Sequence, residues 1–179
     1  MSYSVELNID CFDPGAVLTD VNDILSIYVN MEHSYSGDLD MFITAPNGVQ
    51  VQLFAQTGGS TWFGEAVDND ATATQGFGYD YGWSMNPSYS GTMAEGMASG
   101  NTIAITLPYG QNGITLSPDI YLPLESFNAL LGSPLNGAWN LTIIDNLVFD
   151  NGWVFLLGSF NDPKLIFYIF IGLHRSRCN

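Results

Sequence analysis

The sequence predicts an all-β sandwich, and three observations support this prediction. Helical periodicity is nearly absent from the 179 residues. Short runs in which apolar and polar residues alternate recur along the chain, bounded by Gly, Pro, Asn and Asp. Three of these runs lie between Leu25 and Ala55 with only tight turns between them. A chain of this length forms one domain with a sizeable core.

Seven runs have the pattern of strands. In the segments Leu25–Met31 and Leu39–Ala45 every other residue is apolar, so these residues share one face of a strand. The segment Val49–Ala55 alternates in the same way, which is the period of a half-buried strand and not of a helix. Ser36-Gly37 and Pro46-Asn47-Gly48 supply the turns between these three segments. In chain order, the expected strands are Val5–Ile9, Ile24–Met31, Leu39–Ala45, Val49–Ala55, Asn101–Leu107, Ala138–Asp145 and Gly152–Phe160.

Two other segments need a structural assignment. The stretch Gln56–Gly100 is rich in glycine and aromatic residues, and a structureless loop of that length is unusual inside a compact domain. We expect a further strand within it or near Gly113–Leu116. The segment Leu124–Leu131 could form a single helical turn, which the following Gly132-Ser133-Pro134 would end.

The segment from His33 to Gly48, HSYSGDLDMFITAPNG, resembles the P domain. This domain, also called the homo B domain, follows the catalytic domain of kexin- and furin-like proprotein convertases and recurs in many bacterial secreted proteins. The matching positions of its H-[ST]-Y-x-G-D-L hallmark and Pro-x-Gly turn are His33, Ser34, Tyr35, Gly37, Asp38, Leu39, Pro46 and Gly48. A second block resembles the closing strands of the family, with Phe127, Gly137–Asp145, Gly152 and the apolar run Trp153–Leu157.

The resemblance covers roughly residues 5–160 and implies a jelly-roll β-sandwich of about eight mostly antiparallel strands. We assign residues 1–163 to this P-domain-like sandwich. Residues 164–179 form a tail of different composition, which we interpret as an artificial extension or the product of an altered reading frame. The alternative is that the tail adds a final strand at a sheet edge.

The distribution of charge excludes several functions. All three Lys and Arg residues lie after Pro163, so residues 1–162 carry all 18 carboxylates and no cationic Lys or Arg side chain. Phosphate contacts need a basic surface, so nucleic acid and anionic lipid are not expected partners. A carboxylate buried in this domain cannot pair with Lys or Arg. It must accept hydrogen bonds, take up a proton or bind a cation.

The ends of the chain give little further information. Cys11 and Cys178 could form a disulfide, although their spacing shows no disulfide framework. The apolar run Leu165–Leu173 is too short to span a bilayer, so no membrane insertion is expected. Met1–Ile9 lacks the features of a signal peptide, as expected for a module excised from a longer exported protein.

Asp145 and Asp38 form the first candidate calcium site. By strand parity, Asp145 lies on the same face as Leu141 and Ile143, so its carboxylate should project inward or to the rim of the core. The family resemblance places Asp38 on a neighbouring loop. Calcium takes six to eight oxygen ligands and suits carboxylates mixed with backbone carbonyls. The alternative is that backbone N–H groups of the adjacent turn satisfy the carboxylate.

The middle segment holds a second candidate calcium site. Several acids lie close together in sequence, as oxygen ligands do in a calcium loop. The alternative is a solvated acidic loop, and the spacing does not match an EF-hand. The residues are Glu65, Asp68, Asn69, Asp70 and Asp80. Over the whole domain we expect at least one calcium ion.

The remaining candidate residues are His33 and four aromatic side chains. We expect His33 to be structural, hydrogen-bonded across its turn to Gly37-Asp38, because no second imidazole or thiolate lies at ligand spacing. Aromatic side chains of the middle segment could stack on sugar rings or could simply cap the open end of the sandwich. These possible ligand contacts are Trp62, Tyr79, Tyr81 and Trp83.

The sequence therefore predicts a non-catalytic accessory module of a secreted or cell-surface protein. The module would stabilise, or mediate interaction with, a neighbouring protease or surface domain. This hypothesis predicts an apolar patch on one sheet face, to which Phe42, Phe54 and Ile144 would contribute. The alternative is a calcium-dependent module that binds carbohydrate or a cell-surface polymer, which predicts exposed aromatics beside an acidic loop. No protease motif occurs, and no enzymatic activity is expected.

Overall fold

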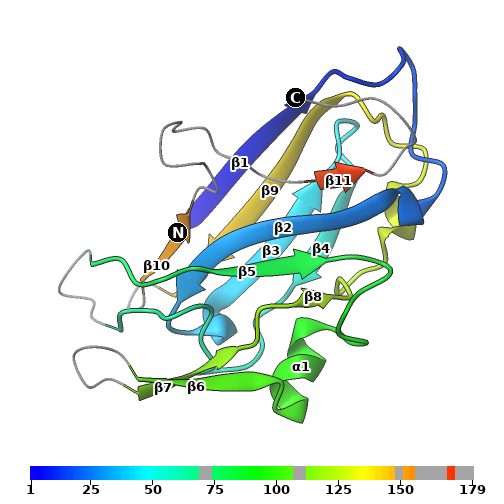
Figure 1. Cartoon of the computed structure of the whole chain (residues 1–179). Helices are drawn as coiled ribbons and strands as arrows, with labels where there is room; N and C mark the ends of the chain where they lie inside the picture. Colours follow the sequence, from blue (N-terminus) through cyan, green and yellow to red (C-terminus); the bar gives the residue numbers. More distant parts are fainter. Residues whose placement is uncertain (69–73, 107–111, 148–150, 156–168, 172–179) are drawn as a thin grey trace.

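The protein is an all-β sandwich, as the sequence predicts (Figure 1). The computed structural model describes residues 1–68, 74–106, 112–147, 151–155 and 169–171. Within these ranges strands predominate, and a single short α-helix accompanies them. Two sheets enclose the main core, and a separate hairpin lies along the lower edge of the molecule in Figure 1.

The first sheet has four antiparallel strands in the order β1-β9-β3-β4. Their bounds are Ser2–Ile9 for β1, Gly137–Asp145 for β9, Leu39–Thr44 for β3 and Gln50–Phe54 for β4. Alternate residues of each strand enter the core, as the period of two requires. The opposite face of this sheet is largely polar, with hydrogen bonds such as Ser4–Thr142 and Gln52–Asp40.

The second sheet has the order β10-β2-β5-β8, with β11 also pairing with β2. Pairing is antiparallel except between β5 and β8, which are parallel. The bounds are Gly152–Phe155 for β10, Ile24–His33 for β2, Tyr79–Trp83 for β5, Ile120–Tyr121 for β8 and Ile169–Ile171 for β11. The two strand orders establish a sandwich, while the jelly-roll connection stays a prediction.

The remaining elements lie around these sheets. A two-stranded antiparallel sheet is formed by β6 (Thr102–Thr106) and β7 (Asn112–Leu116). The helix α1 (Met93–Ser99) begins with a capping box between Thr92 and Glu95. It ends at Gly100, whose φ of +80° is the left-handed conformation that glycine adopts without strain. Three short 3₁₀ helices are η1 (Val21–Asp23), η2 (Ser36–Asp38) and η3 (Phe127–Leu130).

The core between the two sheets contains large aromatic side chains. Trp83 and Trp139 face it from opposite sheets, and both are fully buried. Phe63 lies edge-on to Phe54 and Tyr81, with ring centroids 5.4 and 5.0 Å apart. Such edge-to-face pairs stabilise a core by about 0.5–1.5 kcal/mol each beyond the area they bury. The space between the sheets is therefore filled by side chains.

The expected strands match β1, β2, β3, β4, β6, β9 and β10, with shifts at some of their described ends. The expected strand positions Leu107 and 156–160 lie outside the described residues. Both places proposed for a further strand contain one, namely β5 and β7, and the helical turn expected within Leu124–Leu131 is η3. The sequence analysis missed α1 and the two-residue strand β8.

Two expected side-chain directions are wrong, and in both cases the strand register shifts. Leu25 is 54% exposed and Ile24 is buried in its place, since β2 is irregular where it pairs with β11. Phe54 is buried in the core, because the pairing of β3 with β4 shifts between Met41 and Phe42. One extra residue in a strand reverses the faces of all residues beyond it.

The described part of the tail is β11, which lies antiparallel to β2, as the edge-strand alternative requires. The remaining tail positions, including Cys178 and hence its proposed bond to Cys11, lie outside the described residues. In the described part of the chain, no helix is long and apolar enough to cross a membrane.

Candidate metal site at the rim of the sandwich

The turn between β2 and β3 places Asp38 at the rim of the core. This turn is held against the segment that follows β4: Ser36 N–H donates to the Thr61 carbonyl at 2.9 Å, and Gly37 N–H donates to the Gly59 carbonyl at 3.0 Å. A Cβ atom at Gly37 would lie only 3.0 Å from the Gly59 Cα. Glycine therefore permits the close approach that fixes the turn and, with it, the position of Asp38.

Asp38 is only 6% exposed, and its Oδ2 atom has no hydrogen-bond partner among the described residues. Its backbone carbonyl accepts hydrogen bonds from Asn146 N at 2.9 Å and from Asn146 Nδ2 at 3.0 Å. An ionised carboxylate in such a place lacks the hydrogen bonds that compensate for lost hydration. A proton, an ordered water or a cation would satisfy Oδ2.

Asp145 lies next to Asp38 across the strand pair β3–β9. It pairs directly with Leu39, the buried residue that follows Asp38, so its side chain is on the core face of the sheet. It is partly exposed, and its Oδ1 accepts a hydrogen bond from Leu147 N at 3.1 Å. The expected position at the rim is confirmed, and a backbone N–H of the adjacent turn satisfies one oxygen.

His33 lies between these two acids and the strand β10. Its Nδ1 accepts a hydrogen bond from Tyr35 N–H at 3.1 Å, so the neutral ring carries its proton on Nε2. Burial lowers the pKa of His33, against the opposing effects of the Asp145 and Asp38 carboxylates. Nδ1 is engaged and Nε2 is protonated, so neither is available as a metal ligand. The expected hydrogen bond to Gly37-Asp38 is replaced by the one to Tyr35.

The carboxylates at the rim do not form a three-ligand centre. No group of three or more His, Cys, Asp and Glu side chains that could hold a metal occurs in the described ranges. The ligands of a cation at Asp38 would therefore be the carboxylate oxygens of Asp38 and Asp145, together with backbone carbonyl oxygens and water. Calcium accepts such mixed oxygen donors.

Two acids of the second candidate site, Glu65 and Asp80, are hydrogen-bonded to different side chains. Glu65 Oε1 accepts a hydrogen bond from the Tyr79 hydroxyl at 2.7 Å, and Asp80 Oδ1 accepts one from Asn30 Nδ2 at 2.7 Å. Burial and the bond to Glu65 raise the pKa of Tyr79 to about 12. Asn69 and Asp70 lie outside the described residues, and Asp68 is in contact with other groups. The calcium loop expected there stays a prediction.

The structure decides between the two alternatives for three of the four candidate aromatics. Trp62, Tyr81 and Trp83 are buried, so their rings cannot stack on a sugar. The Tyr81 hydroxyl donates to the Leu116 carbonyl at 3.0 Å, and Tyr79 is half-buried. The middle segment of the chain contains β5 and folds back onto the core.

Glu32 is a buried acid that the sequence analysis missed. It is 1% exposed, its Oε1 accepts a long hydrogen bond from Gly76 N at 3.4 Å, and its Oε2 has no described partner. Burial raises its pKa to about 7. Directly opposite on β10 lies Trp153, whose Nε1 also lacks a partner in the described part. The signal in the sequence was a glutamate at the end of an apolar strand without any nearby Lys or Arg.

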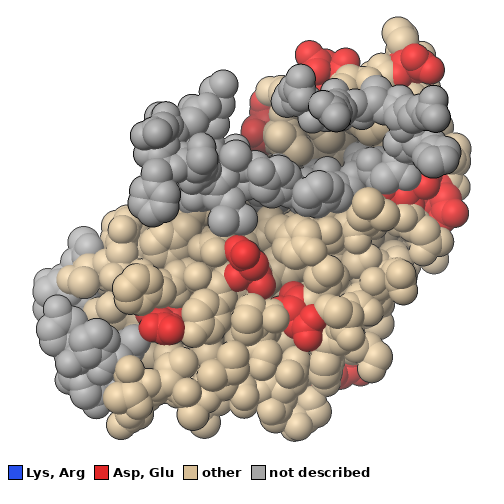
Figure 2. All heavy atoms as spheres, viewed as in Figure 1, with Lys and Arg blue, Asp and Glu red and all other residues tan. Residues whose placement is uncertain are grey.

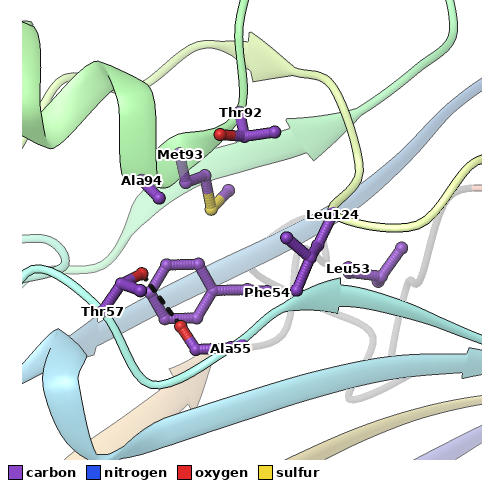
Figure 3. A pocket seen from close by; sticks show the side chains of 8 residues that line it. All are labelled: Leu53, Phe54, Ala55, Thr57, Thr92, Met93, Ala94 and Leu124. Carbon is purple, nitrogen blue, oxygen red and sulfur yellow. Dashed lines mark hydrogen bonds between the residues drawn. The ribbon is translucent and has the colours of Figure 1, made fainter.

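The described surface carries carboxylates, and the pocket found on it is apolar. Figure 2 shows carboxylates scattered over the viewed face, and no Lys or Arg occurs among the described residues. One pocket, shown in Figure 3, is apolar apart from two threonine hydroxyls and has no carboxylate or imidazole in its lining. Its lining residues are Leu53, Phe54, Ala55, Thr57, Thr92, Met93, Ala94 and Leu124.

Comparison with known proteins gives no match. No family model, curated protein or solved structure is significantly similar to this chain. The resemblance to the P domain therefore stays a prediction that depends on the two sequence blocks alone.

Proposed function

We propose that this chain is a non-catalytic β-sandwich module of an exported protein, which binds calcium at the Asp38–Asp145 rim and supports a neighbouring domain of the same protein. The observation that carries the proposal is Asp38 Oδ2, a buried oxygen without a described hydrogen-bond partner. Residues 1–162 contain no Lys or Arg that could neutralise it.

The chemistry of the rim favours a hard cation. The available donors are carboxylate and carbonyl oxygens, and His33 contributes no free nitrogen lone pair. Oxygen donors of this kind suit calcium, while zinc prefers thiolate and imidazole. The net charge of −15 would also attract divalent cations to the protein.

The accessory role is supported by the closed interior of the sandwich. Large aromatic side chains fill the space between the sheets, and the pocket of Figure 3 offers no general acid or base. His33, the histidine of the described residues, is held by Tyr35 and buried.

Calcium titration tests the proposed ion site. After removal of divalent ions with a chelator, calcium should release or absorb heat on binding and raise the melting temperature of the wild-type protein. Asp38→Asn should lose most of this stabilisation. Asp10→Asn, which removes the same charge from an exposed residue, should retain it. Absence of binding heat and of thermal stabilisation in the wild type would overturn the calcium site.

The accessory role has a separate test in the parent protein. Deleting this module from the full-length protein should lower the secreted yield of the neighbouring domain and leave its transcript unchanged. An unchanged yield of folded neighbour would contradict the accessory role.

A further inference from the structure

The edge of the hairpin β6–β7 is open in the described part of the chain. β6 pairs with β7 alone, while β7 is also bonded on its other side to Trp62, whose N–H donates to the Ile114 carbonyl at 2.8 Å. Ile105 and Trp62 anchor the hairpin through a small buried cluster with Ala66. The outer edge of β6 therefore presents backbone groups at a fixed place on the molecule (Figure 1).

Two other edges of the sandwich, those of β4 and β1, are protected. The outer edge of β4 is covered by a later segment, because Leu124 N–H donates to the Leu53 carbonyl at 3.0 Å and Glu125 N–H donates to the Gln52 carbonyl at 2.9 Å. The edge strand β1 carries Glu6 near its middle. Charges and covering segments are the usual means by which proteins prevent edge-to-edge pairing. β6 has neither among the described residues.

The hairpin also lies in one of several long uncharged stretches of a highly acidic protein. No Asp, Glu, Lys or Arg occurs between Glu95 and Asp119, although the whole chain carries a net charge of −15. Two exposed isoleucines lie on this hairpin, Ile103 at 39% and Ile114 at 55% exposure. Two copies of the chain repel each other over most of their surfaces, and they can approach most closely where carboxylates are absent.

The sequence of β6 indicates which partner fits its edge. The strand Thr102–Thr106 reads Thr-Ile-Ala-Ile-Thr and is the same in both directions. If two copies pair antiparallel about Ala104, Thr102 lies opposite Thr106 of the second copy and Ile103 lies opposite Ile105. Thr–Thr pairs and pairs of β-branched residues are favourable cross-strand neighbours. A two-fold symmetric contact requires such self-complementarity.

We propose that β6 is a self-association edge, at which two copies of this chain pair antiparallel about a two-fold axis at Ala104. The dimer joins the two hairpins into one four-stranded sheet. The contact is small and largely main-chain, so association is weak and depends on concentration. Its affinity rises with ionic strength, because salt screens the repulsion between the two acidic bodies.

Sedimentation velocity over a range of protein and salt concentrations tests the dimer. The wild type should shift from monomer to dimer as either concentration rises. Ala104→Lys or Ala104→Glu places like charges opposite each other at the axis and should weaken association by at least about tenfold. Gln50→Lys, an exposed substitution on the covered edge strand β4, should associate like the wild type.

A mixture of the two charged variants tests the register. Lys from one copy and Glu from the other would meet at the axis, so an equimolar mixture of Ala104→Lys and Ala104→Glu should regain the dimer that each variant loses alone. Circular dichroism identical to that of the wild type shows that the variants are folded. A monomeric wild type at high protein and salt concentration, or a dimer that survives in Ala104→Lys, would overturn the proposal. Failure of the mixture would exclude pairing about Ala104.

Discussion

At the scale of single residues, the protein is marked by polar atoms that are buried without a described partner. Four of the six lie at the end of β2 and in the following turn, in Glu32, His33, Ser34 and Asp38, and the other two are the indole N–H groups of Trp83 and Trp153. Each such atom costs about 1–3 kcal/mol unless a water, a proton or an ion satisfies it. Three of these residues, His33, Ser34 and Asp38, belong to the segment that resembles the P domain. Burying their polar atoms lowers the stability of the fold unless a water, a proton or an ion satisfies them.

Glu32 should make stability depend on pH. Its pKa in the folded protein is about 7, above the ordinary value of 4.5, so the folded state binds the proton more tightly than the unfolded state does. The stabilising contribution of the neutral carboxyl group is complete below pH 4.5 and is lost as the pH rises through about 7. The full loss is on the order of 3 kcal/mol.

Glu32→Gln should remove this dependence. The variant should lose less stability than the wild type between pH 5 and pH 8, measured by urea unfolding at both values. Glu6→Gln, at an exposed position of β1, serves as the control and should behave like the wild type. Parallel curves for wild type and Glu32→Gln would show that Glu32 does not titrate in this range.

At the scale of elements, short helices and turns fix how the strands are joined. The helix α1 has only seven residues, so its own hydrogen bonds contribute little, and its ends must be stabilised by side chains. The Thr92 hydroxyl accepts a hydrogen bond from Glu95 N at 3.3 Å, and the Glu95 carboxylate accepts one from Thr92 N at 2.7 Å. Burial of Met93 then attaches the helix to the core.

Loss of this cap should destabilise the protein measurably. Thr92→Ala removes the hydroxyl and should lower the free energy of unfolding by about 0.5–2 kcal/mol, measured by chemical denaturation. Thr92→Ser retains the hydroxyl and should be close to the wild type. A Thr92→Ala variant as stable as the wild type would mean that α1 is held by packing alone.

At the scale of the whole molecule, the net charge of −15 governs behaviour in solution. The carboxylates are spread over the surface, as Figure 2 shows for one face, and no described Lys or Arg offsets them. Repulsion among them opposes the compact state, and dissolved ions reduce it. Stability and self-association are both expected to increase with ionic strength.

Salt should therefore stabilise the fold. The melting temperature in chelator should rise with sodium chloride and then level off as screening becomes complete. Calcium added at constant ionic strength should raise it further if the Asp38–Asp145 rim binds the ion specifically. A melting temperature that does not change with sodium chloride would show that charge repulsion is a minor part of the stability.

The fold class, the positions of most strands and the absence of Lys and Arg from residues 1–162 could all be read from the amino-acid sequence. These features follow from local alternation and from composition, which do not depend on how the strands are joined. The sequence also placed Asp145 at the rim, because parity along one regular strand is a local property.

Only the tertiary structure decided which polar and aromatic groups are buried. Trp62, Tyr81 and Trp83 lie in the glycine-rich segment Gln56–Gly100, and they are buried because that segment returns across the core. Glu32 is buried because residues distant in sequence, Gly64 and Gly76, lie over it. Such burial depends on contacts between segments far apart along the chain, which strand periodicity does not encode.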